Sequence, residues 1–131
     1  MRNINWIYTY SYTAFIKKCT KFGKMSSKNP LLRRFFRILK NIKQRCNNPS
    51  ASGYKYYGGR GIGCLITVTE IIKLWFRDKA HLMKKPSIDR INNDGHYCLD
   101  NCRFIELSEN VKKSHIDRKN RKKVINCLKS E

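Results

Sequence analysis

One segment decides the fold of this chain: Pro86-Ser-Ile-Asp-Arg-Ile-Asn-Asn-Asp-Gly-His-Tyr97, followed by Asn101-Cys-Arg-Phe-Ile105 and Ser108-Glu-Asn110. The segment places a carboxylate, Asp89, and an amide, Asn110, at the two ends of one compact unit. Both side chains offer hard oxygen ligands, which suit Mg²⁺ or a similar cation. In a chain that is otherwise strongly basic, this pair points to metal-assisted chemistry on a nucleic-acid phosphate.

The same segment predicts strand, loop, strand and helix over residues 86–117. Ser87 to Ile91 has the composition of a short strand, and Asn92-Asn-Asp-Gly95 is typical of a turn. Arg103 to Leu107 predicts the second strand. Ser108 is then expected to cap a helix that begins at Glu109.

An amphipathic basic helix is predicted upstream, over Leu31–Cys46. Its apolar residues follow helical spacing, and basic residues take the other positions. The apolar stripe consists of Leu32, Phe35, Phe36, Leu39, Ile42 and Cys46. We interpret this stripe as core, whereas the positive face fits either a solvated surface or a phosphate contact.

The stretch Tyr54-Lys-Tyr-Tyr-Gly-Gly-Arg-Gly-Ile62 interleaves aromatic rings, basic side chains and glycines. It fits a Gly-rich turn with tyrosines packed on the core, and it also allows Arg60 to reach a phosphate. No Lys-Ser or Lys-Thr pair follows, which argues against a nucleotide-binding P-loop. Thr69 is expected to cap a second, core-forming helix that contains Glu70 in its first turn.

The charge balance indicates a polyanionic partner. The chain has 29 Lys and Arg against 9 Asp and Glu, for a formal charge of +20, and no acidic residue precedes Glu70. A nucleic acid is favoured over an anionic membrane surface. No stretch approaches the roughly 18 apolar residues of a membrane span. We therefore expect a nucleic acid as the partner and no membrane. No small-molecule cofactor is expected, and a monomer is expected rather than an oligomer.

The six cysteines are expected to be reduced thiols in an intracellular setting, because no secretory signal precedes them. Cys98 and Cys102, joined by Cys46 or Cys64, allow a structural Zn²⁺ site. Burial as small apolar residues is the preferred interpretation.

The chain divides into three expected regions. Residues 1–30 form a leader or basic arm, residues 31–117 the folded domain, and residues 118–131 a basic tail that is disordered or frayed until it meets a polyanion. The aromatic start of the chain fits a poorly packed leader upstream of a true start at Met25. An interfacial anchor or a transit-type segment is the alternative.

Asp89 within Ser-Ile-Asp-Arg, Asn101 within Asn-Cys-Arg-Phe and Asn110 within Ser-Glu-Asn together resemble the HNH endonucleases, which carry a ββα-metal motif. The resemblance is specifically to small phage and intron-type homing endonucleases, which implies the cytoplasm of a bacterial or phage-infected cell as the compartment. Further similarity to a phage subgroup lies in Arg45-Cys-Asn-Asn-Pro49, Tyr57-Gly-Gly-Arg-Gly-Ile62, Trp75 and Pro86. The resemblance covers about residues 31–115. It implies an α+β fold with a ββα-metal core, preceded by amphipathic basic helices and followed by a basic tail.

The implied activity is the cutting or nicking of double-stranded DNA with Mg²⁺ or another divalent cation. The resemblance implies Asp89 and Asn110 as metal ligands, Asn101 as the residue that fixes the loop, and Arg90 as a group that acts on the phosphate. These four are the expected catalytic residues. The expected DNA contacts are Arg34, Arg37, Arg60, Arg103, Lys112 and Lys113.

The chain departs from the family at Arg90, where most members carry the His that acts as general base. A guanidinium stays protonated and cannot accept the proton of water in the usual way. That proton would pass to solvent, to a phosphate oxygen or to a nearby His. His96 is a conceivable base, although a solvated loop His is the preferred interpretation, and His115 better fits a phosphate contact.

A second class of function stays open at this point. A non-catalytic binder would keep the charge and lose the chemistry, either as an HNH relative without its base or as a basic RNA- or ribosome-associated protein. Both metal-ligand candidates favour the enzyme, and Arg90 favours the binder.

Overall fold

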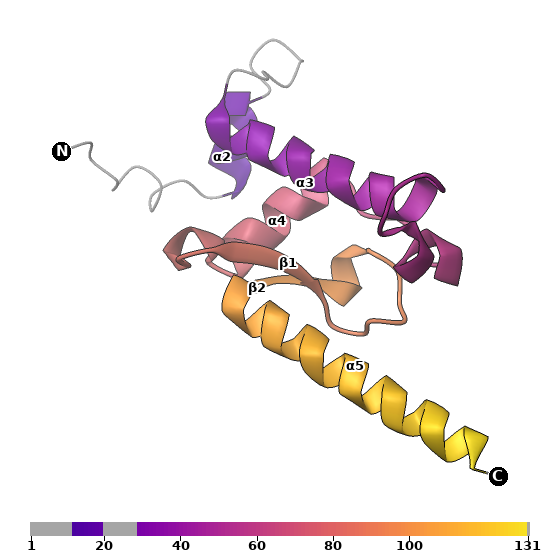
Figure 1. The fold of residues 1–131 in the computed structure, drawn as a ribbon. Helices are drawn as coiled ribbons and strands as arrows, with labels where there is room; N and C mark the ends of the chain where they lie inside the picture. The colour runs from indigo at the N-terminus through magenta and orange to yellow at the C-terminus, as the bar shows by residue number, and fades with distance from the viewer. Residues whose placement is uncertain (1–11, 20–28, 131) are drawn as a thin grey trace.

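The computed structural model describes residues 12–19 and 29–130 (Figure 1). Over these residues the protein is α+β, with helices packed around a two-stranded antiparallel sheet, as the sequence predicted. Most of the expected leader, including Met25, lies outside the described residues. Within it, α2 (Tyr12–Cys19) is described and places Phe15 in the core, against Phe35 and Phe76.

The predicted basic helix is confirmed as α3 (Pro30–Asn47). Asn29 caps it, because the Asn29 Oδ1 accepts hydrogen bonds from the backbone N–H groups of Leu31 (2.9 Å) and Leu32 (3.3 Å). Pro30 has no N–H and occupies the first turn, where no donor is needed. The apolar stripe is buried at Leu32, Phe35, Ile42 and Cys46, whereas Phe36 is exposed.

The second predicted helix is α4 (Val68–Arg77), and its expected cap was wrong by two residues. Thr67, not Thr69, is the N-cap, because Thr67 and Glu70 have the three-residue spacing of a capping box. The Glu70 N–H donates to Thr67 Oγ1 (3.2 Å), and the Thr67 N–H donates to Glu70 Oε1 (3.1 Å). The helix is core, as expected, with Trp75 packed edge-on against Phe35.

The two predicted strands are confirmed as β1 (Pro86–Arg90) and β2 (Cys102–Glu106). In their antiparallel register, Asp89 lies opposite Arg103 and Arg90 lies opposite Cys102. Side chains alternate between the two faces of a strand. Cys102 and Phe104 accordingly point into the core, where Phe104 packs on Trp75.

The final helix, α5 (Leu107–Lys129), differs from the prediction at both ends. It begins at Leu107 rather than Glu109, and Ser108 lies inside it instead of capping it. Glu106 is the N-cap residue of α5, but its side chain makes no capping hydrogen bond. The Glu106 carboxylate instead accepts hydrogen bonds from the backbone N–H groups of Lys84 (2.7 Å) and Lys85 (3.1 Å).

The expected disorder of residues 118–123 was also wrong, because these residues belong to α5. No Gly or Pro interrupts residues 107–129, and the abundant Lys and Arg are good helix formers. In Figure 1 the C-terminal half of α5 runs past the sheet. No α5 residue is buried.

Candidate functional site

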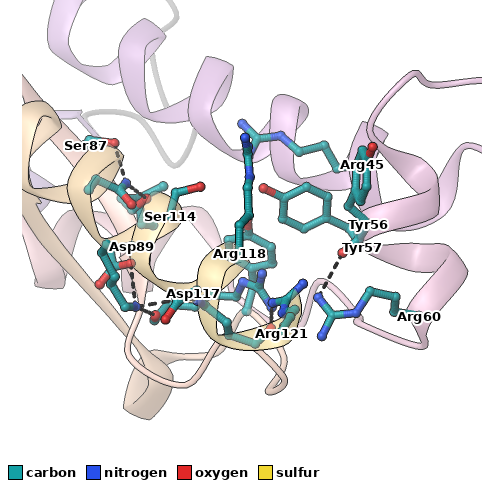
Figure 2. Close-up of a pocket in the computed structure, with 16 residues that line it drawn as sticks. Arg45, Tyr56, Tyr57, Arg60, Ser87, Asp89, Ser114, Asp117, Arg118 and Arg121 are labelled. Atoms are coloured by element: carbon teal, nitrogen blue, oxygen red, sulfur yellow. Dashed lines mark hydrogen bonds and ion pairs between the residues drawn. The ribbon is translucent and has the colours of Figure 1, made fainter. Parts of the chain in front are cut away.

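A cleft of about 510 Å³ lies on the outer side of β1, with α5 as one wall (Figure 2). The α5 side chains that line it recur every three or four residues, so they occupy one helical face. They are Asn110, Lys113, Ser114, Asp117, Arg118 and Arg121. The helical continuation through residues 118–121 therefore adds two arginines to the wall.

The opposite wall comes from the end of α3 and from the Gly-rich stretch, and it contributes Arg45, Tyr56, Tyr57 and Arg60. Close contact between the two segments explains the glycine at position 58, where a Cβ would lie 2.0 Å from the backbone oxygen of Cys46. Tyr57 stacks on Tyr97 with ring centroids 6.2 Å apart. The Gly-rich stretch is thus a turn packed on the core that also presents basic side chains to the cleft.

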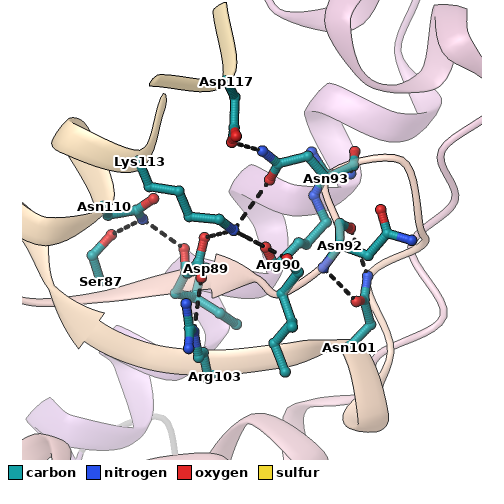
Figure 3. Close-up of polar contacts among 12 residues, drawn as sticks. Ser87, Asp89, Arg90, Asn92, Asn93, Asn101, Arg103, Asn110, Lys113 and Asp117 are labelled. Carbon is teal, nitrogen blue, oxygen red and sulfur yellow. Dashed lines mark hydrogen bonds and ion pairs between the residues drawn. The ribbon is translucent and has the colours of Figure 1, made fainter. Parts of the chain in front are cut away.

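Asp89 lies buried at the base of the cleft, with a side chain that is 3% exposed (Figure 3). Its Oδ2 accepts a hydrogen bond from Arg103 Nε at 2.9 Å, and its Oδ1 accepts one from Lys113 Nζ at 2.9 Å. A carboxylate that is buried away from solvent requires charged or hydrogen-bonding partners in the protein. Arg103 and Lys113, which are two of the six residues expected to contact DNA, are therefore paired with Asp89 of the same chain.

The Lys113 ammonium has further oxygen partners. It contacts the backbone oxygens of Arg90 and Ile91 (3.4 Å for the second) and the Asn93 Oδ1 (3.4 Å). The Asn93 Nδ2 in turn donates to the Asp117 carboxylate, which lines the cleft. Lys113 thus occupies a small cage of oxygen atoms.

Asn110 lies at the same end of the cleft as Asp89. Its Nδ2 donates to Ser87 Oγ (2.9 Å) and to the backbone oxygen of Ile88 (3.1 Å), the residue before Asp89. Its Oδ1 has no hydrogen-bond partner among the described residues and is available to a ligand. The two predicted metal ligands thus line the same cleft, and a hydrogen bond between α5 and β1 joins Asn110 to the residue before Asp89.

Arg90 is buried and holds the loop that follows β1. Its Nη1 donates to the backbone oxygens of Asn93 (2.6 Å) and Gly95 (2.9 Å), and its guanidinium carbon lies 5.1 Å and 4.9 Å from the ring centroids of Tyr57 and Tyr97. These contacts give Arg90 a structural role that the sequence did not indicate. Arg90 also lines the cleft, and its action on a phosphate stays a prediction.

Asn101 makes three hydrogen bonds to the same loop. Its Oδ1 accepts from the Asn92 N–H (2.9 Å), and its Nδ2 donates to the backbone oxygens of Asn92 (3.0 Å) and His96 (2.9 Å). Gly95 is close beside it, since a Cβ there would lie 2.7 Å from Asn101 Nδ2. These are the contacts by which an Asn fixes a loop, whereas a part in catalysis stays a prediction.

The two histidines that were considered as partners of a phosphate or as a base, His96 and His115, do not line the cleft. His96 Nδ1 accepts a hydrogen bond from the Gly63 N–H (2.8 Å), which ties the loop to the Gly-rich stretch. His115 lies exposed on α5, off the face that lines the cleft. Within the described part of the chain, no histidine lines the cleft.

The remaining predicted DNA contacts lie on several surfaces. Arg60 lines the cleft and pairs with Asp94. Arg34 lies over the Trp75 ring at 5.2 Å, and Arg37 and Lys112 are exposed. Arg45 and Tyr56 line the cleft without having been singled out as contacts, whereas Arg118 and Arg121 belong to the basic tail that was expected to meet a polyanion, but not as part of a helix. The two α5 arginines could have been found by extending the helical period from Asn110, at i+8 and i+11.

Cys46 and Cys102 are buried among apolar residues, as the preferred interpretation expected, and a structural zinc site stays a hypothesis. Cys46, Cys64, Cys98, Cys102 and Cys127 form no disulfide. Over residues 12–19 and 29–130, no group of three or more His, Cys, Asp or Glu side chains gathers in the way that is typical of a structural zinc site. Burial raises the pKa of the Cys102 thiol to about 12.

Comparison of the chain with known protein families, with characterised proteins and with solved structures finds no match. No helix in the described part of the chain is long and apolar enough to cross a membrane.

Proposed function

We propose that the protein is an HNH-type endonuclease that cuts or nicks double-stranded DNA with a divalent cation. One observation carries this proposal: Asp89 and Asn110 lie together at one end of a cleft whose walls are rich in arginine. The strand, loop, strand and helix arrangement, with Asn101 bonded to the loop, supports the finer assignment to a ββα-metal core.

The side chains at this place fit a hard cation such as Mg²⁺. Asp89 supplies a carboxylate, and the unpartnered Oδ1 of Asn110 supplies an amide oxygen. When bound, the cation supplies positive charge that stabilises the scissile phosphate and its leaving oxygen. Arg45, Arg118 and Arg121 would hold the DNA backbone across the cleft, as phosphate contacts that fix its position.

A plasmid-nicking assay with and without Mg²⁺ tests the activity. Asp89→Ala and Asn110→Ala should each abolish Mg²⁺-dependent cleavage. Both variants should leave DNA binding mostly intact, because the proposed phosphate contacts are made by the arginines of the cleft walls. Glu109→Ala, which changes an exposed side chain of the same helix that does not line the cleft, should still cleave. Unchanged turnover in Asp89→Ala would reject the proposed metal site.

A non-catalytic nucleic-acid binder is the second candidate, and two observations favour it. Arg90 occupies the position of the family's general base and is committed to loop carbonyls, and Lys113 already neutralises Asp89. This candidate predicts binding without nicking under every divalent cation. Cleavage gained by a folded Arg90→His variant, where the wild type is inert, would identify the protein as a relative that has lost its base.

The endonuclease proposal carries two further expectations: that the protein acts as a monomer, and that it works inside a bacterial or phage-infected cell. Sedimentation of the protein with and without a DNA duplex would test the first of them.

A further inference from the structure

We infer that Lys113 is a built-in counter-cation that must leave Asp89 before a divalent cation can bind there. This inference rests on the proposed metal site and adds its regulation. The Lys113 ammonium occupies the position beside Asp89 Oδ1 that a metal ion bound to this oxygen would need (Figure 3).

The contacts of Lys113 are those of a bound cation. Four oxygen atoms surround its Nζ: the Asp89 Oδ1 (2.9 Å), the backbone oxygens of Arg90 and Ile91, and the Asn93 Oδ1 (3.4 Å). All four belong to β1 and the loop that follows it. An ammonium and a divalent cation compete for the same hard oxygens, so only one of them can be held by Asp89 Oδ1 at a time.

Lys113, rather than Arg103, is the partner that can move aside. Lys113 lines the cleft, where a phosphate or a cation would enter, whereas Arg103 approaches Asp89 from outside the cleft lining. A phosphate entering the cleft would give the displaced ammonium a new oxygen partner. Nucleic acid and divalent cation should therefore bind cooperatively.

Titration with Mn²⁺ in the absence of nucleic acid, followed by the loss of the free-ion electron paramagnetic resonance signal, tests the inference. Removing Lys113 in Lys113→Met should tighten Mn²⁺ binding by about tenfold or more, because a charge-assisted hydrogen bond to Asp89 no longer has to be broken. Lys112→Met removes the same charge from an exposed neighbour and should change the affinity by less than about twofold.

Wild-type protein provides a second measurement that does not depend on the folding of a variant. Acetylation by an N-hydroxysuccinimide ester, read by mass spectrometry, should modify Lys113 more slowly than Lys112 without a cation. Saturating Mn²⁺ should raise the rate at Lys113 several-fold and leave Lys112 unchanged.

The outcomes separate this inference from the proposed function. If the wild type binds Mn²⁺ and nicks DNA, while Lys113→Met binds Mn²⁺ no more tightly and Lys113 labelling ignores the cation, the counter-cation role is wrong and the endonuclease stands. If neither the wild type nor Lys113→Met binds Mn²⁺ and no divalent cation supports nicking, the metal site fails and the inference fails with it.

Discussion

Gly58 occupies a position where no other residue fits without a shift of backbone. A Cβ at Gly58 would lie 2.0 Å from the Cys46 backbone oxygen, whereas a Cβ at Gly53 would meet only ordinary contacts at 3.5 Å. Gly58→Ala should therefore lower the free energy of unfolding by about 2 kcal/mol or more, as overpacking does. Gly53→Ala, the matched control, should stay within about 1 kcal/mol of the wild type. Urea unfolding measures both, and equal effects would contradict the close approach.

Arg90 is the second residue whose replacement should affect stability. Arg90→Met removes two hydrogen bonds from a buried guanidinium to the carbonyls of Asn93 and Gly95. Because hydrogen bonds from charged groups contribute more than neutral ones, the loss should amount to about 2–4 kcal/mol of unfolding free energy. Arg37→Met, on the exposed face of α3, should change it by less than about 0.5 kcal/mol.

Activity measurements on Arg90 variants need this stability control. A loss of cleavage in Arg90→Met that vanishes when only folded protein is counted would assign Arg90 to the loop rather than to the phosphate. Stability equal to that of the wild type would contradict the structural role described for Arg90.

At the scale of the secondary-structure elements, α5 combines two parts with different tasks. Its first turns pack on the sheet and supply Asn110 and Lys113, whereas residues 118–129 have no buried side chain. Deleting residues 118–131 should therefore leave the unfolding free energy within about 0.5 kcal/mol of the wild type. The same deletion should weaken DNA binding, because Arg118 and Arg121 leave the cleft.

The salt dependence of binding measures how many phosphates the deleted segment neutralised. The plot of log affinity against log salt should flatten by about 0.9 for each phosphate that the shortened protein no longer neutralises. Arg118→Gln with Arg121→Gln should reproduce most of the change, whereas Lys119→Gln with Lys122→Gln, which do not line the cleft, should have a smaller effect. Equal effects of the two pairs would mean that α5 binds DNA without using the cleft face.

At the scale of the whole molecule, buried acidic groups predict that the fold weakens in alkali. Burial raises the pKa of Cys102 from 9.0 to about 12, and burial together with nearby Tyr57 raises the pKa of Tyr97 from 10.0 to about 12. Both groups stay neutral in the fold but ionise earlier in the unfolded chain. Their contribution to stability is therefore complete below about pH 9 and is lost progressively between about pH 9 and pH 12.

Urea unfolding at pH 7 and pH 10, with a reductant to keep the thiols free, measures this effect. Each group should remove roughly 1 kcal/mol of unfolding free energy per pH unit once its unfolded form ionises. In Cys102→Ala the overall stability should be lower, but its decrease between these pH values should be smaller than in the wild type. A decrease as large as that of the wild type would show that Cys102 ionises equally in both states.

Local sequence was enough to predict α3, α4, β1 and β2, but it predicted neither α2, whose Phe15 is buried, nor the continuation of α5 beyond residue 117. The spacing of Leu32, Phe35 and Ile42 predicted α3, and turn residues between two β-forming runs predicted β1 and β2. These signals depend only on residues close together in the chain. The errors were at helix ends, at Thr67 and Leu107, where several capping residues compete and tertiary contacts select one.

The sequence by itself also predicted that Asp89 and Asn110 would lie on the same side of the strand pair, because a helix that directly follows a strand pair packs against it, and both residues line one cleft. Only the tertiary structure decided what surrounds them. Lys113 and Arg103 neutralise Asp89, and Arg90 faces Tyr57 and Tyr97 instead of standing free. A buried charge takes its partners from whichever donors the packing brings within about 3 Å, and neither periodicity nor composition encodes that proximity.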